Sequence, residues 1–331
     1  MHSLEAIRHS NAQTQSRNEA GASRLQVQKM TTASESKARL KGVFNITVTP
    51  FIPGDGIDFR GLAENIERLL GLGFDGLLIG GTYGEFPAMS VEERATLFRR
   101  VFEIVRDRVP VLLCSAHSDP RVAFELTQLA AELGGIPMIT APFVSEVDDE
   151  HIVGFFRALA PASSSGLVIY NAPGIGITLS ARLIERLSDM SHVIGLKQGD
   201  LNPTTIDELS NRLGGKIKLF CASDLAFLGP LSAGFDGLSS TNSCALSELI
   251  LQCFRAMMAG DAHTATRLHS SWFEYRELAR RFGQPQTVKA AMAYRGWAGG
   301  VVRPPLLAIT SDQREKLDAV LDLILAPGER G

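Results

Sequence analysis

The sequence has few of the residues that hold disulfide-rich proteins or cysteine metal centres together. Its 331 residues contain four cysteines, Cys114, Cys221, Cys244 and Cys253, which lie far apart and form no CxxC pair. We therefore expect buried neutral thiols rather than a disulfide framework or a metal site. A reducing, cytoplasmic location follows as the default expectation.

The sequence also lacks a surplus of charge of either sign and any long apolar run. Lys and Arg number 33 against 36 Asp and Glu, a net charge of −3, and no basic cluster is interleaved with aromatic residues. A nucleic-acid partner is therefore not expected. Apolar stretches such as 166–170 and 323–326 are far shorter than the roughly 20 residues of a transmembrane helix, so no membrane partner is expected either.

Residues 1–40 differ in composition from the rest of the chain. Ser, Gln, Asn, Thr, Glu and Arg dominate, and no apolar period of a helix or strand persists. We predict a polar extension that is mobile or loosely helical, because this composition offers little apolar surface to bury. The segment lacks the apolar core of a signal peptide, and Glu5, Glu19 and Glu35 argue against an organelle-targeting leader.

From Gly42 onward, short apolar segments alternate with amphipathic ones. The compositions typical of buried strands occur at 43–49, 75–79, 110–114, 136–140, 167–170, 193–196, 217–220 and 236–238. Helical spacing of apolar residues follows these strands at 58–72, 90–107, 119–133, 148–159, 180–189, 203–213 and 224–233. About eight strand–helix units predict an α/β fold, a (β/α)8 TIM barrel over residues 41–260. A doubly wound open sheet is the alternative, but no GxGxxG follows the first strand.

The strand pattern stops after Ala245, and the rest of the chain has the spacing of helices. We predict helices at 246–259, 262–281, 287–295 and 312–326, and a C-terminal helical subdomain over 261–331 packed on the barrel. Helix boundaries have local signals as well. Ser90 followed by Glu93 is a capping box for the helix that begins there.

Lys197 is the most informative single residue, because barrel enzymes have their active sites at the carboxyl ends of the strands. It is the only one of eight lysines at such an end. One interpretation is a salt bridge with Asp200 or Asp224. The other is an amine whose pKa is lowered by burial, which makes it a nucleophile. Position alone does not separate the two.

Tyr170 ends the strand that precedes the one carrying Lys197, and it is one of four tyrosines. Neighbouring strand ends can bring a phenol and an amine to the same ligand. In Schiff-base chemistry the amine attacks a ketone and the phenol transfers protons. The alternative is a tyrosine packed at the barrel rim with its hydroxyl group hydrogen-bonded.

The segment 80–85 reads Gly80-Gly81-Thr82-Tyr83-Gly84-Glu85 and follows the second predicted strand. Glycines let the backbone approach a ligand, and successive amides together with the Thr82 hydroxyl can hold an anion. The alternative is a tight turn into the helix at Ser90.

Together these motifs resemble those of the dihydrodipicolinate synthase/N-acetylneuraminate lyase family. GTYGE at 81–85 is similar to its GTTGE loop, YNAP at 170–173 to its YNxP segment, and GLK at 195–197 to its Schiff-base GxK strand. VTPF at 48–51 and RPPL at 303–306 are also similar in residue type to segments of this family. The resemblance covers roughly residues 41–326. It implies a class I aldolase barrel with a C-terminal helical domain, assembled as a homo-oligomer, either a tetramer or a dimer.

The resemblance also assigns roles to residues. It implies that Lys197 forms the imine and that Tyr170 transfers protons with Thr82. The carboxylate of a 2-oxo acid substrate would lie on the loop of Gly81, Thr82, Tyr83 and Gly84, and substrate hydroxyl groups would contact Asp224 and Thr241. The covalent imine on Lys197 is expected to make a metal or diffusible cofactor unnecessary.

Some positions depart from the family patterns. Tyr83 stands where the loop usually has a second Thr or Ser, and Phe143 and Val144 replace the paired tyrosines of the synthase. Ile175 replaces the synthase's arginine, the cation for the carboxylate of aspartate semialdehyde. Leu225 replaces the second sugar-binding acid of the lyase branch. We therefore expect a lyase or aldolase that acts on pyruvate or another 2-oxo acid by aldol chemistry or dehydration, with a true dihydrodipicolinate synthase as the alternative.

Two further alternatives rank lower. The run 239–241, Ser-Ser-Thr, could bind phosphate at a helix start, which would indicate a phospho-sugar aldolase. A catalytically silent barrel that binds a metabolite is the other, against which Lys197 and Tyr170 argue. His117 follows the third predicted strand without an assigned role, since with Cys114 alone it makes a poor metal site.

Overall fold

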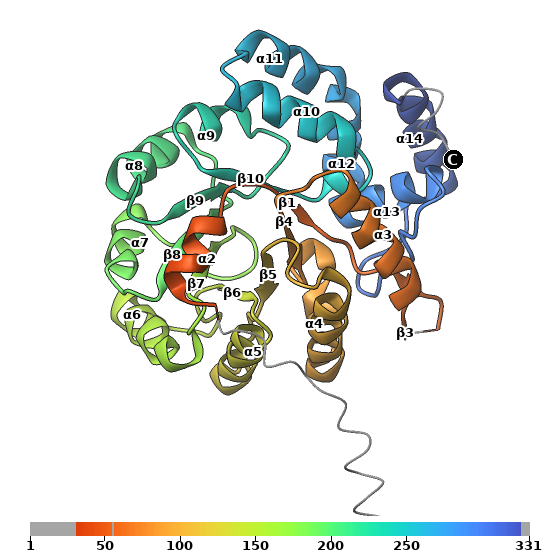
Figure 1. The fold of residues 1–331 in the computed structure, drawn as a ribbon. Coiled ribbons are helices and arrows are strands. Elements are labelled where there is room, and N and C mark those ends of the chain that lie inside the picture. The colour runs from red at the N-terminus through yellow and green to blue at the C-terminus, as the bar shows by residue number, and fades with distance from the viewer. Residues whose placement is uncertain (1–30, 55, 326–331) are drawn as a thin grey trace, which may run out of the picture.

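Eight parallel strands form a closed barrel at the centre of the molecule (Figure 1). The computed structural model describes residues 31–54 and 56–325. Strands adjacent in the barrel follow one another along the chain, and β1 closes the barrel by pairing with β4 and β10. The strands are β1 (Gly42–Ile46), β4 (Gly76–Ile79), β5 (Val111–Cys114), β6 (Ile136–Ile139), β7 (Leu167–Asn171), β8 (Val193–Gln198), β9 (Lys218–Cys221) and β10 (Gly237–Ser240). The predicted TIM barrel is confirmed.

Helices surround the barrel and begin where their local caps lie. At α4 the Ser90 hydroxyl accepts from the Glu93 amide and the Glu93 carboxylate accepts from the Ser90 amide, so the predicted capping box is present. The barrel helices are α3 (Phe59–Gly71), α4 (Val91–Val105), α5 (Pro120–Glu132), α6 (Asp149–Ala158), α7 (Ala181–Ser188), α8 (Pro203–Leu213), α9 (Leu228–Ser232) and α10 (Ser247–Met258).

Helix α9 begins at Leu228, so the predicted start at Asp224 is wrong. The Asp224 carboxylate accepts hydrogen bonds from Ser240 and Asn242 and caps no helix. Residues 222–227 form instead the loop that follows β9.

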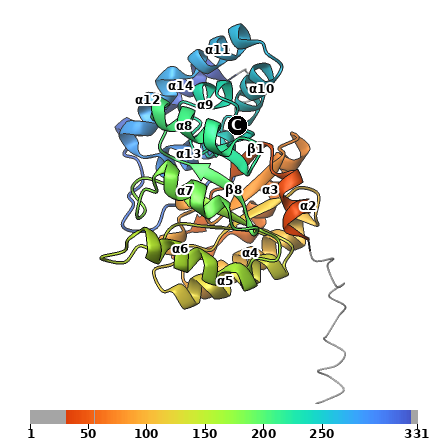
Figure 2. The same cartoon turned by 90° about the vertical axis from the view of Figure 1, so that its left-hand side faces the viewer.

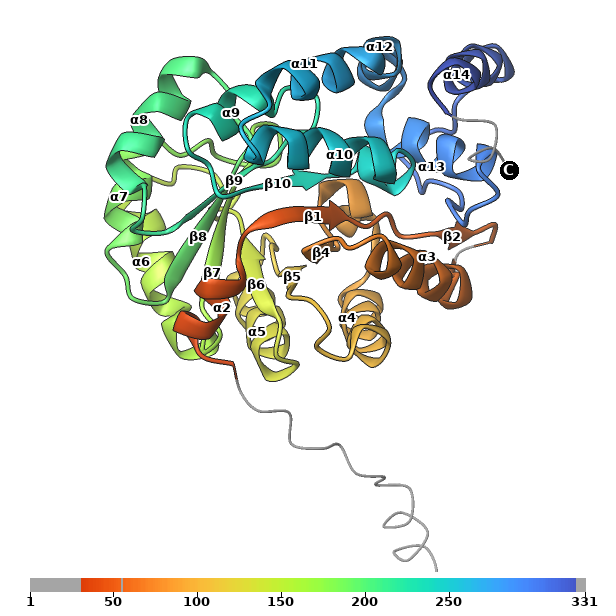
Figure 3. The same ribbon diagram turned by 45° about the horizontal axis from the view of Figure 1, so that its top comes forward.

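The C-terminal helices lie together on one side of the barrel (Figures 2 and 3). They are α11 (Ala262–Ser271), α12 (Phe273–Phe282), α13 (Gln284–Tyr294) and α14 (Ser311–Ile324). The single helix predicted for 262–281 is therefore two helices, which meet at Trp272. The indole of Trp272 is fully buried and packs edge-on against His269 at 5.8 Å between ring centroids. The helix is interrupted where this large ring is buried, although the apolar spacing of a helix continues through the sequence.

A short helix, α2 (Ala33–Arg39), precedes the barrel and packs against β8. A capping box between Thr32 and Glu35 begins it, and Leu40 at its end is fully buried. A Cβ at Gly195 would lie 3.4 Å from Leu40, so Leu40 fills the space beside this glycine. Residues 33–40, which the composition assigned to a polar extension, thus cover part of the barrel, while residues 1–30 lie outside the described residues.

The strands are buried on both faces, as in other parallel barrels. All six residues of β8 are buried, and Phe44 of β1 meets Phe220 of β9 edge-on at 5.0 Å between ring centroids. A short antiparallel pair, β2 (Phe51–Ile52) with β3 (Gly56–Ile57), lies outside the barrel. Within the described ranges, none of the helices combines the length and the apolar character that crossing a membrane demands.

Candidate active site

Lys197 lies near the carboxyl end of β8 in an almost dry environment. Its side chain is 3% exposed, and Nζ lies 4.0 Å from the centroid of the Tyr170 ring. Burial lowers the pKa of the Lys197 amine from its ordinary value near 10.5 to about 7. Among the described residues no carboxylate forms an ion pair with it, so neither predicted salt bridge is present. With this pKa, about half of the Lys197 side chains are neutral amines at pH 7.

Tyr170 lies beside Lys197 in the register between β7 and β8. Its hydroxyl group is 2.9 Å from the Thr82 hydroxyl, and either oxygen can donate this hydrogen bond. Burial raises the pKa of the Tyr170 phenol, which therefore keeps its proton at neutral pH. The structure thus brings together the amine, the phenol and the loop hydroxyl that the sequence singled out.

The loop after β4 forms two short 3-10 helices, η1 (Thr82–Gly84) and η2 (Phe86–Ala88). Gly81 packs closely against the barrel, because a Cβ there would lie 2.8 Å from the end of the Leu78 side chain, which would have to shift. Thr49 donates from its hydroxyl to the Gly84 carbonyl at 2.7 Å. The amides of Gly84 and Glu85 donate within the loop, whereas those of Thr82 and Tyr83 have no partner in the part of the chain that the structure describes.

A buried ion pair anchors this loop to the C-terminal helices. Glu85 has a positive φ of 60°, and its Oε1 lies 2.5 Å from Nζ of Lys289 on α13. Their side chains are 2% and 3% exposed. The other Glu85 oxygen accepts from the Arg303 amide at 2.9 Å. Sequence analysis missed Glu85 and Lys289 as functional residues, and the only sequence signal was the place of Glu85 within the GTYGE motif.

A second set of hydrogen bonds joins the ends of β7 and β8. Asn171 donates from its side-chain amide to the Gln198 side chain at 2.9 Å and accepts from the Leu179 amide at 2.9 Å. Asn171 and Gln198 are both fully buried. These bonds fix the two strand ends that carry Tyr170 and Lys197, which explains why an asparagine follows Tyr170.

Asp224 is buried and heavily hydrogen-bonded. Its carboxylate accepts from the Ser240 hydroxyl at 2.5 Å, and from the Asn242 amide and side chain at 2.8 and 2.7 Å. Ser239 donates to the Cys221 carbonyl. The Ser239 and Ser240 hydroxyl groups are therefore engaged within the protein. Only the Thr241 hydroxyl of this run has no partner among the described residues, and a single hydroxyl makes no cradle for phosphate. The structure gives the phospho-sugar alternative no support.

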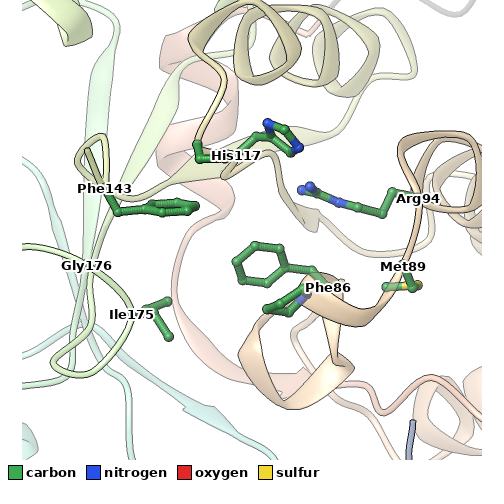
Figure 4. Close-up of a pocket in the computed structure, with 9 residues that line it drawn as sticks. Phe86, Met89, Arg94, His117, Phe143, Ile175 and Gly176 are labelled. Carbon is green, nitrogen blue, oxygen red and sulfur yellow. The ribbon is translucent and has the colours of Figure 1, made fainter. Parts of the chain in front are cut away.

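A cavity of about 380 Å³ opens beside these loops (Figure 4). Figure 4 shows Phe143 and Ile175 on one side of it and Arg94 and Met89 on the other. The remaining lining residues are Phe86, Pro87, His117, Ser118 and Gly176. The Arg94 guanidinium is buried and donates from its two terminal nitrogens to the carbonyl groups of Cys114 and Ala116, while its Nε has no hydrogen-bond partner among the described residues.

His117 lies in this cavity wall, and its Nδ1 accepts from the Asp119 amide at 2.9 Å. It contributes to the turn before α5. Among residues 31–54 and 56–325, no cluster of three or more His, Cys, Asp or Glu side chains has the arrangement of a metal site.

A barrel with a buried amine of lowered pKa beside a phenol defines a Schiff-base-forming enzyme of the class I aldolase type. Comparison with known proteins agrees with this class. The chain matches the family model described as Dihydrodipicolinate synthetase family over residues 39–324. It is 30% identical over 283 residues to 4-hydroxy-tetrahydrodipicolinate synthase 2 of Halalkalibacterium halodurans, covering 85% of this chain and 97% of that protein.

Solved structures give the same result. Dihydrodipicolinate synthase from Bacillus anthracis is similar at a TM-score of 0.82 and 26% identity, covering 86% of this chain and 99% of that one. YagE from E. coli K12, a prophage protein of the dihydrodipicolinic acid synthase family solved with pyruvate, has a TM-score of 0.81 at 24% identity, covering 86% and 98%. At this identity the similarity to YagE shows a shared fold only.

The chain belongs to the dihydrodipicolinate synthetase family, which confirms the resemblance drawn from its motifs. It is a lyase of the class I aldolase type that acts on pyruvate or another 2-oxo acid through a Schiff base.

Proposed function

We propose that Lys197 is the amine that attacks the 2-oxo acid, and that Tyr170 and Thr82 move the protons. The Lys197 nitrogen bonds to C2 of the substrate and loses a proton, while the former carbonyl oxygen becomes a hydroxyl group. Tyr170 protonates this hydroxyl, which leaves as water, and the nitrogen lone pair forms the iminium. The contact of 2.9 Å between Tyr170 and Thr82 supports this assignment, because it gives the phenol a partner from which to regain its proton.

The loop of Gly81, Thr82, Tyr83 and Gly84 holds the substrate carboxylate in this proposal. The amides of Thr82 and Tyr83 are available as donors, and Thr49 and Glu85 fix the loop from both sides. Preorganised backbone donors bind an anion without reorganisation when the substrate arrives. Asp224 and Thr241 lie farther along the substrate, on the side of β9 and β10.

The iminium accepts electrons from a bond β to it, so one intermediate supports aldol cleavage, aldol condensation or dehydration. Loss of a proton from C3 gives an enamine, which adds to the carbonyl carbon of an aldehyde as the aldehyde oxygen takes up a proton. Hydrolysis of the new imine returns water to C2 and the free amine to Lys197. The sequence of steps needs neither a metal nor a diffusible cofactor.

Borohydride trapping tests the proposal. Incubation with pyruvate and borohydride reduces the iminium to a stable secondary amine, and we expect a single adduct that peptide mass spectrometry maps to Lys197. Lys216→Arg is the matched control and keeps the adduct, because Lys216 lies in the turn before β9 and pairs with Asp189. An adduct on another lysine, or none with any 2-oxo acid, would refute the mechanism.

The structural context supports a substrate other than aspartate semialdehyde. Ile175 and Phe143 line the cavity beside the loops and carry neither a charge nor a hydrogen-bonding group. The relatives named as synthases leave that activity as the alternative. We also propose that the protein is cytoplasmic and forms a homo-oligomer, a tetramer or dimer. Phe143 and Val144 support the oligomer, because these apolar residues are 37% and 50% exposed in the segment that replaces the paired tyrosines of the synthase.

A further inference from the structure

Two buried amide side chains lie behind Tyr170 and Lys197 in the barrel wall. Asn171 follows Tyr170 at the end of β7, and Gln198 follows Lys197 at the end of β8. Successive side chains of a strand point to opposite faces, so the two amides lie on the face turned away from Tyr170 and Lys197. Both amides are fully buried. A substrate bound at Lys197 therefore does not contact them.

The polar atoms of both amide side chains are engaged in hydrogen bonds. The Asn171 nitrogen donates to Gln198 Oε1 at 2.9 Å and to the Leu179 carbonyl at 3.2 Å, and the Asn171 oxygen accepts from the Leu179 amide at 2.9 Å. The Gln198 nitrogen donates to the Asp200 carbonyl at 2.9 Å. A fully paired network in a dry interior resists displacement, because any shift would leave a buried polar group without a partner.

Stability alone does not explain two amides at this place. Strands of a parallel barrel are covered on both faces and normally carry apolar side chains there. Ile169 and Leu196, two residues earlier on the same face of each strand, follow this rule and are fully buried. Replacing both partners of a buried hydrogen bond by apolar groups of the same shape is often close to neutral in stability. What Asn171 and Gln198 add is a directional bond with a fixed length between the two strands.

The bond lies where the alignment of β7 with β8 matters most. Tyr170 is the neighbour of Lys197 in this pairing, and Asn171 is the neighbour of Gln198. The register is irregular at the other end of the pair, between residues 167 and 168. The alignment at the start of the strands therefore does not determine the alignment at their ends, which the two amides join directly.

We propose that Asn171 and Gln198 are positioning residues that hold the Tyr170 phenol in place beside Lys197 for proton transfer. Their role rests on the proposed function, because they act through the proton transfer assigned to Tyr170. The Lys197 nitrogen lies 4.0 Å from the centroid of the Tyr170 ring, so a small shift of either strand changes the place of the phenol relative to the reacting carbon. Misplacement of a reacting group by about 1 Å can slow a reaction on the order of 100-fold.

A double-mutant cycle with Tyr170 tests this role, with the rate of adduct formation from pyruvate measured by rapid-quench borohydride trapping. Gln198→Met removes the bond between the strands and the bond to Asp200, and leaves both bonds between Asn171 and Leu179. We expect it to slow adduct formation about 10-fold when Tyr170 is present, but less than about 2-fold in the Tyr170→Phe background. The effects are not additive, because a phenol that is absent cannot be misplaced.

The dependence on pyruvate concentration gives a second readout. The loop proposed to hold the carboxylate follows β4, which is adjacent to neither β7 nor β8. Gln198→Met should therefore lower the maximal rate and leave the half-saturating pyruvate concentration unchanged. Asn65→Leu is the matched control, since Asn65 is also a buried amide, 1% exposed, and donates to the Ala298 carbonyl at 2.8 Å. It should keep the wild-type rate per folded molecule.

The outcomes separate positioning from a structural role. An unchanged rate in Gln198→Met, or equal slowing with and without the Tyr170 phenol, would overturn the assignment. Asn171→Leu in the same cycle provides a second measurement if Gln198→Met does not fold, and rates are taken per folded molecule. Absence of any pyruvate adduct on wild-type Lys197 would instead refute the Schiff-base mechanism itself, so failure of the proposed function is recognised separately.

Discussion

At Lys197, exclusion of water decides which chemistry the side chain can perform. An ordinary lysine is neutral in roughly one molecule in 3,000 at pH 7, whereas a pKa of about 7 makes about half of the molecules nucleophilic. Position 197 could be singled out from the sequence because a charged residue at the end of an apolar strand is a local signal. Its lowered pKa could not be derived in the same way, since that depends on β7, β9 and the loops that close over it.

The pH dependence of imine formation follows from this pKa. The reactive form is the deprotonated amine, which dominates above the pKa, so the single-turnover rate with pyruvate rises through about pH 7 and levels off by about pH 8.5. Rapid-quench borohydride trapping between pH 5.5 and 10 measures this rate. A rate that continues to rise tenfold per pH unit up to pH 10 would indicate an ordinary lysine and contradict the role of burial.

Among the elements, the loop after β4 depends on contacts that no local pattern contains. Its glycines and Thr82 could be predicted as a binding loop, because they form a short motif after a strand. The partner of Glu85, however, is Lys289 on α13, more than two hundred residues further along the chain. Helix ends show the same contrast. The capping box of α4 is local and was predicted, whereas the break at Trp272 and the late start of α9 depend on tertiary contacts.

Removing one partner of the Glu85–Lys289 pair is expected to destabilise the protein. Glu85→Gln leaves the buried Lys289 ammonium without its counter-charge, which costs about 3–5 kcal/mol of unfolding free energy. Urea denaturation measures the change. Glu64→Gln is the matched control, because Glu64 pairs with Arg60 on the surface and its loss costs less than about 1 kcal/mol.

Equal stabilities of Glu85→Gln and Glu64→Gln would show that the buried pair does not hold the loop. Glu85→Gln combined with Lys289→Met should recover part of the lost free energy, because the second substitution removes the unpaired charge. The KM for pyruvate should rise in Glu85→Gln, since the loop that carries the proposed carboxylate site loses its anchor.

On the scale of the whole molecule, the C-terminal helices complete the site of the barrel. The alternation of strands and helices predicts the barrel and the helical region that follows it, because both have a regular apolar period. It does not predict that α13 sends Lys289 toward the loop after β4, where Lys289 pairs with Glu85. Lys289 finds this partner only when the barrel closes and brings residues far apart in the chain together.

The architecture also bears on which 2-oxo acid reaction this family member performs. A distal carboxylate normally needs a cation or several donors, and loss of such a partner costs a few kcal/mol, roughly 100-fold or more in kcat/KM. Ile175 stands where the synthase has its arginine and contributes only apolar surface to the cavity wall.

We therefore predict weak or no condensation of pyruvate with aspartate semialdehyde in a coupled assay. Ile175→Arg should increase this activity about tenfold or more. A wild-type kcat/KM of about 10⁴ M⁻¹s⁻¹ or above, the usual enzyme range, would mean that another group binds the aldehyde's carboxylate. That result would contradict the argument from Ile175 and leave the roles of Lys197 and Tyr170 untouched.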